Sequence, residues 1–336
     1  MAAKTAKKAA VKTTAKTSIK TAVPMPPEAK RWAGNIPAIK PGRYADGIPY
    51  PEIEYAACKL ILRPNHFVSR KSLFDFAKVM RAPAAKHGVK FSTDEYIDAP
   101  LKIREVLFVD TKDFRLYKNA FILRRRIPYR DGFPDGEAEI VFKFRHQDLQ
   151  TTAETDIRPQ IKGDYRIKFK AQALPLKDRL GGIRMLYSHN VQFPRSSLGE
   201  GGSGLDAITM AQIVNIFPVL ERLKKQPNEK IELVSETIIE EVLQDIGVLD
   251  FGDGVAAKVN VSLWRTRGEH RPLIGEFAYQ LRFKDRQEAR ERLAALQRLE
   301  EFFLSLQLAA KDWIALNATK TGVVYRLQGS PPNAHE

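Results

Sequence analysis

The 336-residue chain has one cysteine, six histidines and no run of about 18 consecutive apolar residues. The single cysteine, Cys58, excludes an intrachain disulfide and favours an intracellular location. The missing apolar run argues against a membrane span, and the N-terminus lacks the apolar core of a signal peptide. The histidines show no spacing typical of a metal site, and no P-loop motif is present. We therefore predict a cytoplasmic protein without a membrane partner.

Acidic residues are scarce relative to basic ones. There are 40 Asp and Glu against 55 Lys and Arg, which gives a net charge of +15 and a pI near 9.7. A field of that sign concentrates anions such as nucleic acids, anionic lipids or phosphate compounds. Residues 1–30 hold seven lysines and one acid, Glu28, and so carry +6 of this charge. The remaining +9 belongs to the rest of the chain and needs its own explanation.

The composition divides the chain into three segments. Residues 1–30 contain almost no large apolar side chains, so they cannot bury enough surface to offset their ordering entropy. Residues 31–50 are rich in Pro and Gly and are typical of a linker. We predict a disordered tail and linker at 1–50, a folded domain at 51–325 and a disordered C-terminus at 326–336. The basic tail either makes weak contacts with nucleic acid phosphates or only keeps the chain in solution.

Strand patterns dominate after residue 50. Helical spacing of apolar residues appears at 67–88, at 208–217 after a Gly/Ser loop at 195–206, and at 285–308. Several antiparallel strands with a few covering helices indicate an α+β fold rather than alternating βαβ units. The strands are expected at 52–62, 104–110, 119–128, 137–146, 164–171, 231–249, 257–266 and 272–283.

Basic residues alternate within four of these strands. Residues two apart in a strand lie on the same face, so each strand presents a pair or trio of cations together. The sets are Arg124 and Arg126; Lys143 and Arg145; Arg166, Lys168 and Lys170; and Arg265 and Arg267. A solvated outer face would explain them. The alternative is the inside of a barrel, where the cations would repel one another unless an anion such as a phosphate chain filled the space.

The stretch 109–126, VDTKDFRLYKNAFILRRR, with EIVFKFR at 139–145, resembles the signature of the CYTH, or triphosphate tunnel metalloenzyme, superfamily. The order of the later segments also fits, so the resemblance spans about 51–325. It implies an antiparallel eight-stranded β-barrel whose tunnel binds triphosphate or polyphosphate. It also implies hydrolysis of the phosphoanhydride with Mg²⁺ or Mn²⁺ held by glutamates.

Site residues follow from the resemblance and the strand alternation together. The candidate phosphate ligands are Arg124, Arg126, Lys143, Arg145, Lys168, Arg265, Arg267 and Lys59, and the candidate metal ligands are Glu52, Glu54, Glu154 and Glu276.

The glutamate pattern departs from that of the superfamily. Where the first strand usually shows E-x-E-x-K, Glu52 and Glu54 are followed by Ala56. If Lys59 takes the lysine position instead, Tyr55 and Ala57 replace the two acids. Three hypotheses therefore remain open: a metal-dependent triphosphatase, a polyanion-binding module without catalysis, and a nucleic-acid-binding protein that uses its basic tail. The sequence predicts neither the physiological substrate nor the oligomeric state.

Overall fold

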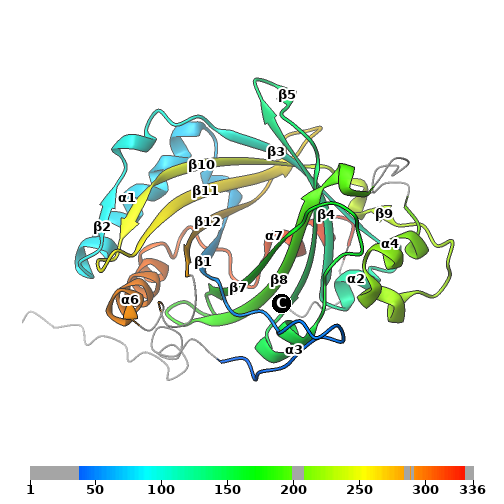
Figure 1. Cartoon of the computed structure of the whole chain (residues 1–336). Helices are drawn as coiled ribbons and strands as arrows, with labels where there is room; N and C mark the ends of the chain where they lie inside the picture. Colours follow the sequence, from blue (N-terminus) through cyan, green and yellow to red (C-terminus); the bar gives the residue numbers. More distant parts are fainter. Residues whose placement is uncertain (1–37, 199–207, 284–287, 289–290, 330–336) are drawn as a thin grey trace, which may run out of the picture.

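The computed structural model describes residues 38–198, 208–283, 288 and 291–329 (Figure 1). The predicted tail at 1–30, most of the Gly/Ser loop and the last seven residues lie outside the described residues, so the predictions made for them remain predictions. Within the described part, nine strands form one closed ring in which β3 pairs back with β10. In ring order they are β10 (Ile239–Asp250), β11 (Ala256–Thr266), β12 (Pro272–Arg282), β1 (Tyr55–Leu62), β7 (Arg166–Leu174), β8 (Arg184–Pro194), β6 (Glu139–His146), β4 (Phe121–Arg130) and β3 (Lys102–Asp110).

The α+β barrel was predicted, but the eight-stranded, fully antiparallel ring was wrong. A ring in which every neighbour is antiparallel needs an even number of strands, so nine strands require at least one parallel pair. That pair is β1 and β7, in register from Tyr55 opposite Lys170 to Cys58 opposite Ala173. Short strands β2 (Lys90–Ser92), β5 (Phe133–Pro134) and β9 (Glu232–Leu233) extend the sheet outside the ring.

The extra strand is β8, which the sequence analysis missed. It pairs with both β6 and β7 and is buried along almost its whole length. Its alternate residues Ser188, Asn190 and Gln192 are polar although they are buried. A strand with polar side chains on a buried face lacks the apolar alternation by which strands are recognised in a sequence.

Helices cover the outside of the ring, so the apolar faces of the strands point outward. Helices α1 (Arg70–Lys86) and α6 (Leu293–Ala309) share one apolar core with β1, β10, β11 and β12. Helix α4 (Met210–Ile216) shares another with β4, β6 and β8, and α3 (Leu149–Glu154) covers part of β7 and β8. Because side chains alternate across a strand, this arrangement turns the opposite, polar faces into the interior of the ring.

Helix α7 (Lys320–Tyr325) packs across one end of the ring interior (Figure 1). Val324 and Tyr325 share an apolar cluster with inward residues of six strands, including Ile61, Val106 and Ile274. Tyr325 stacks on Tyr117 of α2 (Arg115–Lys118), with ring centroids 4.1 Å apart. The interior is thus apolar at the α7 end and polar beyond it.

Residues 38–50 were predicted to be disordered linker, but in the structure they pack against the domain. The Tyr44 hydroxyl donates to the Ala153 carbonyl at 2.6 Å, and the Lys40 amide donates to Gln150 Oε1 at 2.8 Å. Tyr44 is also covered by the Arg158 guanidinium. None of the helices in the described part of the chain combines the length and the hydropathy needed to span a membrane.

Candidate functional site

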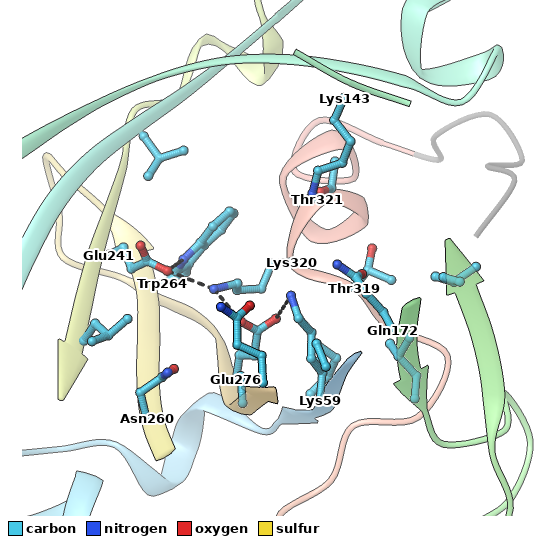
Figure 2. Close-up of a pocket in the computed structure, with 18 of the residues that line it drawn as sticks. Lys59, Lys143, Gln172, Glu241, Asn260, Trp264, Glu276, Thr319, Lys320 and Thr321 are labelled. Carbon is cyan, nitrogen blue, oxygen red and sulfur yellow. Dashed lines mark hydrogen bonds and ion pairs between the residues drawn. The ribbon is translucent and has the colours of Figure 1, made fainter. Parts of the chain in front are cut away.

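The polar part of the ring interior forms a cavity of about 510 Å³ (Figure 2). Its walls come from alternate residues of the strands, such as Ala57, Lys59 and Ile61 of β1, and Thr319, Lys320 and Thr321 contribute from the start of α7. Two carboxylates, Glu241 and Glu276, face eight basic side chains. The basic side chains are Lys59, Arg104, Arg124, Arg126, Lys143, Arg145, Lys258 and Lys320.

Six of the predicted site residues lie together in this lining. Arg124 and Arg126 come from β4, Lys143 and Arg145 from the paired strand β6, and Lys59 and Glu276 from the paired strands β1 and β12. The outward residues between the cations, such as Phe142 and Phe144, are buried under α4 and its neighbours. Burial of the apolar faces therefore forces these cations inward.

Arg124 and Lys143 are the cavity cations whose positive charge is least neutralised by nearby carboxylates. In the ranges that the structure describes, neither side chain has a carboxylate within ion-pair distance, and Arg124 Nε is buried without a hydrogen-bond partner. Burial, followed by repulsion from Arg124, Arg145 and Lys59, holds the pKa of Lys143 well below its usual range. Burial and the neighbouring Arg126 likewise lower the pKa of Arg124. Charges held in this way favour binding of an anion that neutralises them.

Lys170 extends the cation set beyond the lining. It lies on the inward face of β7, two residues before Gln172, and its ammonium donates to Gln280 Oε1 at 3.0 Å. Burial, followed by repulsion from Lys59 and Lys168, lowers the pKa of Lys170 to about 7.

We expect the free energy of unfolding, measured without ligand, to rise from pH 7 to about 8.5. Lysines in the unfolded chain titrate near ~10.4, whereas Lys170 in the fold titrates at about 7. The unfolded state therefore binds more protons over this window, which makes stability increase with pH. Above about 8.5 the buried Cys58, whose pKa is raised, opposes the trend because its unfolded thiol ionises there.

Urea denaturation at a series of pH values measures this effect. Lys170→Met should reduce the slope, part of which Lys143 maintains, and a control at the exposed Lys71 should leave it unchanged. A flat or falling stability in the wild type over the same window would contradict the expectation.

The two carboxylates of the cavity are bound by cations of the protein itself (Figure 2). The Lys320 ammonium lies 2.9 Å from Glu241 Oε1 and 2.9 Å from Glu276 Oε1. Glu241 also pairs with Arg104 and accepts a 2.9 Å hydrogen bond from Trp264 Nε1, and Glu276 lies 3.7 Å from Lys59. Burial opposes ionisation of Glu241, but Lys320 and Arg104 outweigh it and hold the pKa of Glu241 well below its usual range.

This donor set does not fit the divalent metal that the resemblance implies. Mg²⁺ needs oxygen ligands in near-octahedral geometry, usually one or two carboxylates plus substrate phosphate. Here the two carboxylates enclose an ammonium. Across the described ranges, no three Asp, Glu, His or Cys side chains gather in a way that could hold a metal. The Mg²⁺ or Mn²⁺ cofactor stays a prediction from the sequence alone.

Three of the four predicted metal ligands lie elsewhere. Glu52 and Glu54 precede β1 and are even-numbered, whereas the odd residues of that strand face the cavity. Lys59 does face it, so Tyr55 and Ala57 stand at the positions where the superfamily has its first two acids. Glu154 ends helix α3 and accepts a hydrogen bond from Gln150 at the surface.

Three of the predicted phosphate ligands also lie outside the cavity lining. Arg265 pairs with Glu240 and Arg267 with Glu105, both away from the interior, because Trp264 takes the inward position on β11. The prediction for β11 was therefore inverted: its aromatic side chain faces in and its arginines face out. Lys168 shares the inward face of β7 but lies four residues before Gln172, beyond the lining.

Four charged residues of the lining were not predicted from the sequence. Arg104 and Lys258 lie in strands that were predicted, but neither belongs to the pairs and trio of alternating cations recognised there, since the strand predicted at 104–110 leaves out Lys102. Glu241 lies in the long apolar stretch at 231–249, in which no charged residue was selected as a site candidate. Lys320 follows the last predicted helix, and nothing in its neighbourhood signals that the chain returns into the barrel.

No family model matches the chain, and no curated protein matches it at the threshold applied. Solved structures similar to it include a putative adenylyl cyclase from Hippeastrum, described as having a dominant triphosphatase activity. The two chains are 10% identical, with 83% of this chain and 98% of that one covered at a TM-score of 0.36. A putative adenylate cyclase from Bacillus halodurans is 12% identical, with 80% and 95% covered at a TM-score of 0.33. A protein from Pyrococcus horikoshii OT3 is 10% identical, with 74% and 89% covered at a TM-score of 0.28.

The sequence motif noted above contributes directly to the cavity. The motif at 109–145 supplies four of the cations of the cavity, from Arg124 to Arg145, and the strands that carry them belong to a closed barrel. In this motif, the chain resembles the CYTH, or triphosphate tunnel metalloenzyme, superfamily.

Proposed function

We propose that the cavity binds a short, multiply charged phosphate chain, such as inorganic triphosphate or the triphosphate group of a larger compound. The observation that carries this proposal is the pair Arg124 and Lys143, two partly buried cations that face the cavity and have no carboxylate within ion-pair distance in the described part of the protein. Arginine forks and lysine ammonium groups both suit phosphate oxygens. The volume of about 510 Å³ lies within the usual range for a small-molecule site.

The charge distribution favours an elongated anion over a single phosphate. Cations line several walls: β1, β3, β4, β6 and β11 each contribute at least one. A single phosphate group reaches only a few of them, whereas a chain of three can contact opposite walls together. Because α7 fills one end of the interior, the ligand enters from the other end.

The resemblance also predicts that the bound anion is hydrolysed. The side chains of the cavity support hydrolysis less well than they support binding. A metal-dependent phosphoanhydride hydrolase uses carboxylates to hold the ion that bridges the phosphate oxygens. Glu241 and Glu276 are both engaged with Lys320. We therefore favour a binding module over a triphosphatase, and a phosphate-release assay decides between them. Nucleic-acid binding through the tail stays a separate prediction.

Thermal unfolding with added ligand tests the proposal. A ligand that binds only the folded state stabilises it, by about 2.7 kcal/mol when present at 100 times its Kd. We expect clear stabilisation by tripolyphosphate, less by pyrophosphate, and little by orthophosphate or sulfate. Equal effects of tripolyphosphate and sulfate at matched ionic strength would argue against a built site.

Arg124→Met and Arg265→Met form a matched pair for this experiment. Arg124 faces the cavity, whereas Arg265 pairs with Glu240 outside it. Removing a buried cation that contacts phosphate should weaken tripolyphosphate binding by about 2 kcal/mol or more. The Arg265 variant should bind like the wild type. Calorimetric titration measures both, and equal affinities for the two variants would place the ligand elsewhere.

A further inference from the structure

We propose that Lys320 is a built-in cation at the position between Glu241 and Glu276, so that the cavity takes up its phosphate ligand without a divalent metal. This inference deepens the proposed function and rests on it for the ligand. The arrangement of Lys320 itself is a separate claim about the two carboxylates and can be tested without any phosphate.

The position of the ammonium carries the proposal. Lys320 Nζ lies 2.9 Å from an oxygen of each carboxylate and 3.4 Å from the Ser262 hydroxyl. It also lies 4.7 Å from the centroid of the Trp264 ring, in a cation–π contact. An ammonium that pairs with one carboxylate from β10 and one from β12, on either side of β11, occupies the space that a bridging metal would need (Figure 2).

The fold holds Lys320 firmly in that place. Thr319 caps α7 by accepting a hydrogen bond from the Gly322 amide, which fixes the start of the helix. At the other end, the Tyr325 hydroxyl donates to the buried Asp110 carboxylate at 3.1 Å, and Ser235 donates to the Val324 carbonyl at 2.8 Å. The helix is therefore anchored to the barrel on both sides of the lysine.

The charges of the side chains around Glu241 and Glu276 explain why a lysine ammonium in place of a metal suits a site that binds an anion. Two buried carboxylates without a counterion would repel each other and any phosphate chain nearby. With Lys320 between them and with Lys59 and Arg104 alongside, the group is no longer anionic. Arg124 of β4 and Lys143 of β6, which have no carboxylate within ion-pair distance in the described ranges, can then act on the ligand.

The first arm of the test uses Mn²⁺ alone, followed by the loss of its free-ion electron paramagnetic resonance signal. The wild type should bind no Mn²⁺ at this site. Lys320→Met, which leaves the two carboxylates without their ammonium, should bind one Mn²⁺ at least about 10-fold more tightly than any residual wild-type binding. Lys320→Met with Glu241→Gln and Glu276→Gln should lose that binding. Wild-type binding as tight as that of Lys320→Met would overturn the inference.

The second arm measures tripolyphosphate binding by calorimetry with EDTA and with excess Mg²⁺. Wild type should bind in EDTA, and Mg²⁺ should not improve the affinity. Lys320→Met should bind weakly in EDTA and more tightly with Mg²⁺, whereas Lys320→Arg should behave like the wild type. Loss of wild-type binding in EDTA would overturn the inference, while no binding under any condition would instead refute the proposed function.

Two controls distinguish the specific loss of the Lys320 ammonium from unspecific effects of the substitution. Lys311→Met removes an exposed lysine from the loop before α7 and should change neither arm. If Lys320→Met unfolds more easily because its carboxylates repel, Mn²⁺ should raise its Tm, and Mn²⁺ should not raise that of the triple variant. A Tm of Lys320→Met that does not respond to Mn²⁺ counts against the proposal.

Discussion

Lys143→Met is expected to weaken tripolyphosphate binding by about 100-fold and, at the same time, to stabilise the ligand-free protein. The two effects have one cause. Lys143 is partly buried in the cavity wall, and the charged groups that lower its pKa are Arg124, Arg145, Lys59 and Lys170, which are all cations. Its ammonium is therefore unfavourable in the empty cavity and favourable when an anion is present.

The gain in stability without ligand should be on the order of 1–2 kcal/mol, or a few degrees in Tm. Methionine keeps most of the length and apolar volume of the lysine side chain and removes the charge. Calorimetric titration gives the loss of affinity, and urea denaturation gives the stability. Lys71→Met, at an exposed position of α1, should change neither quantity.

An opposite sign in either measurement would be informative. A destabilised Lys143→Met variant would mean that the ammonium has a favourable partner in the folded protein. Unchanged affinity would mean that Lys143 does not contact the ligand and that the cation-lined cavity is not the binding site.

Tyr325→Ala should destabilise the protein by about 3–5 kcal/mol, the largest loss of stability that we predict. Tyr325 is 2% exposed, stacks on Tyr117, and contacts Phe108 and Phe114 edge to face. Truncation leaves a large cavity at the α7 end of the barrel. Because α7 carries Lys320, the same substitution should also weaken tripolyphosphate binding.

Tyr325→Phe separates the packing of the ring from its hydrogen bond. It removes only the hydroxyl that donates to Asp110, so it should cost about 1 kcal/mol. Tyr165→Ala serves as the exposed control and should have little effect. Urea denaturation measures all three variants. A loss below about 1 kcal/mol for Tyr325→Ala would show that α7 is not needed to close the barrel.

Several features of the fold could be predicted because they depend on local patterns. The strands β1, β3, β4, β6, β7, β11 and β12 were expected near their observed bounds, as were helices α1 and α4 and the end of α6. The alternation of cations in β4 and β6 was also correctly interpreted as facing inward. On β6 the neighbours of the cations, Phe142 and Phe144, are large and apolar, and only a covering helix on the outside could bury them. On β4 the residue between the two inward arginines is Arg125, which pairs with Glu105.

The same alternation of cations led to a wrong prediction of which face of β11 points into the barrel. A strand pattern tells which residues share a face, but it does not tell which face becomes the interior. The interior of this barrel changes along its axis: near α7 it is apolar and takes Trp264, and farther along it is polar and takes Lys258. Arg265 and Arg267 were therefore assigned to the interior although they lie outside.

The sequence by itself determined most of the strands and which cations share a strand face, because charge alternation and apolar alternation are both encoded residue by residue. Only the tertiary structure decided the nature of the acidic site. The register of β1 puts Lys59 inward and Glu52 and Glu54 outside, and the return of the chain at α7 places Lys320 between Glu241 and Glu276. Those contacts join residues up to 79 positions apart in the chain, and strand alternation carries no information about such separations.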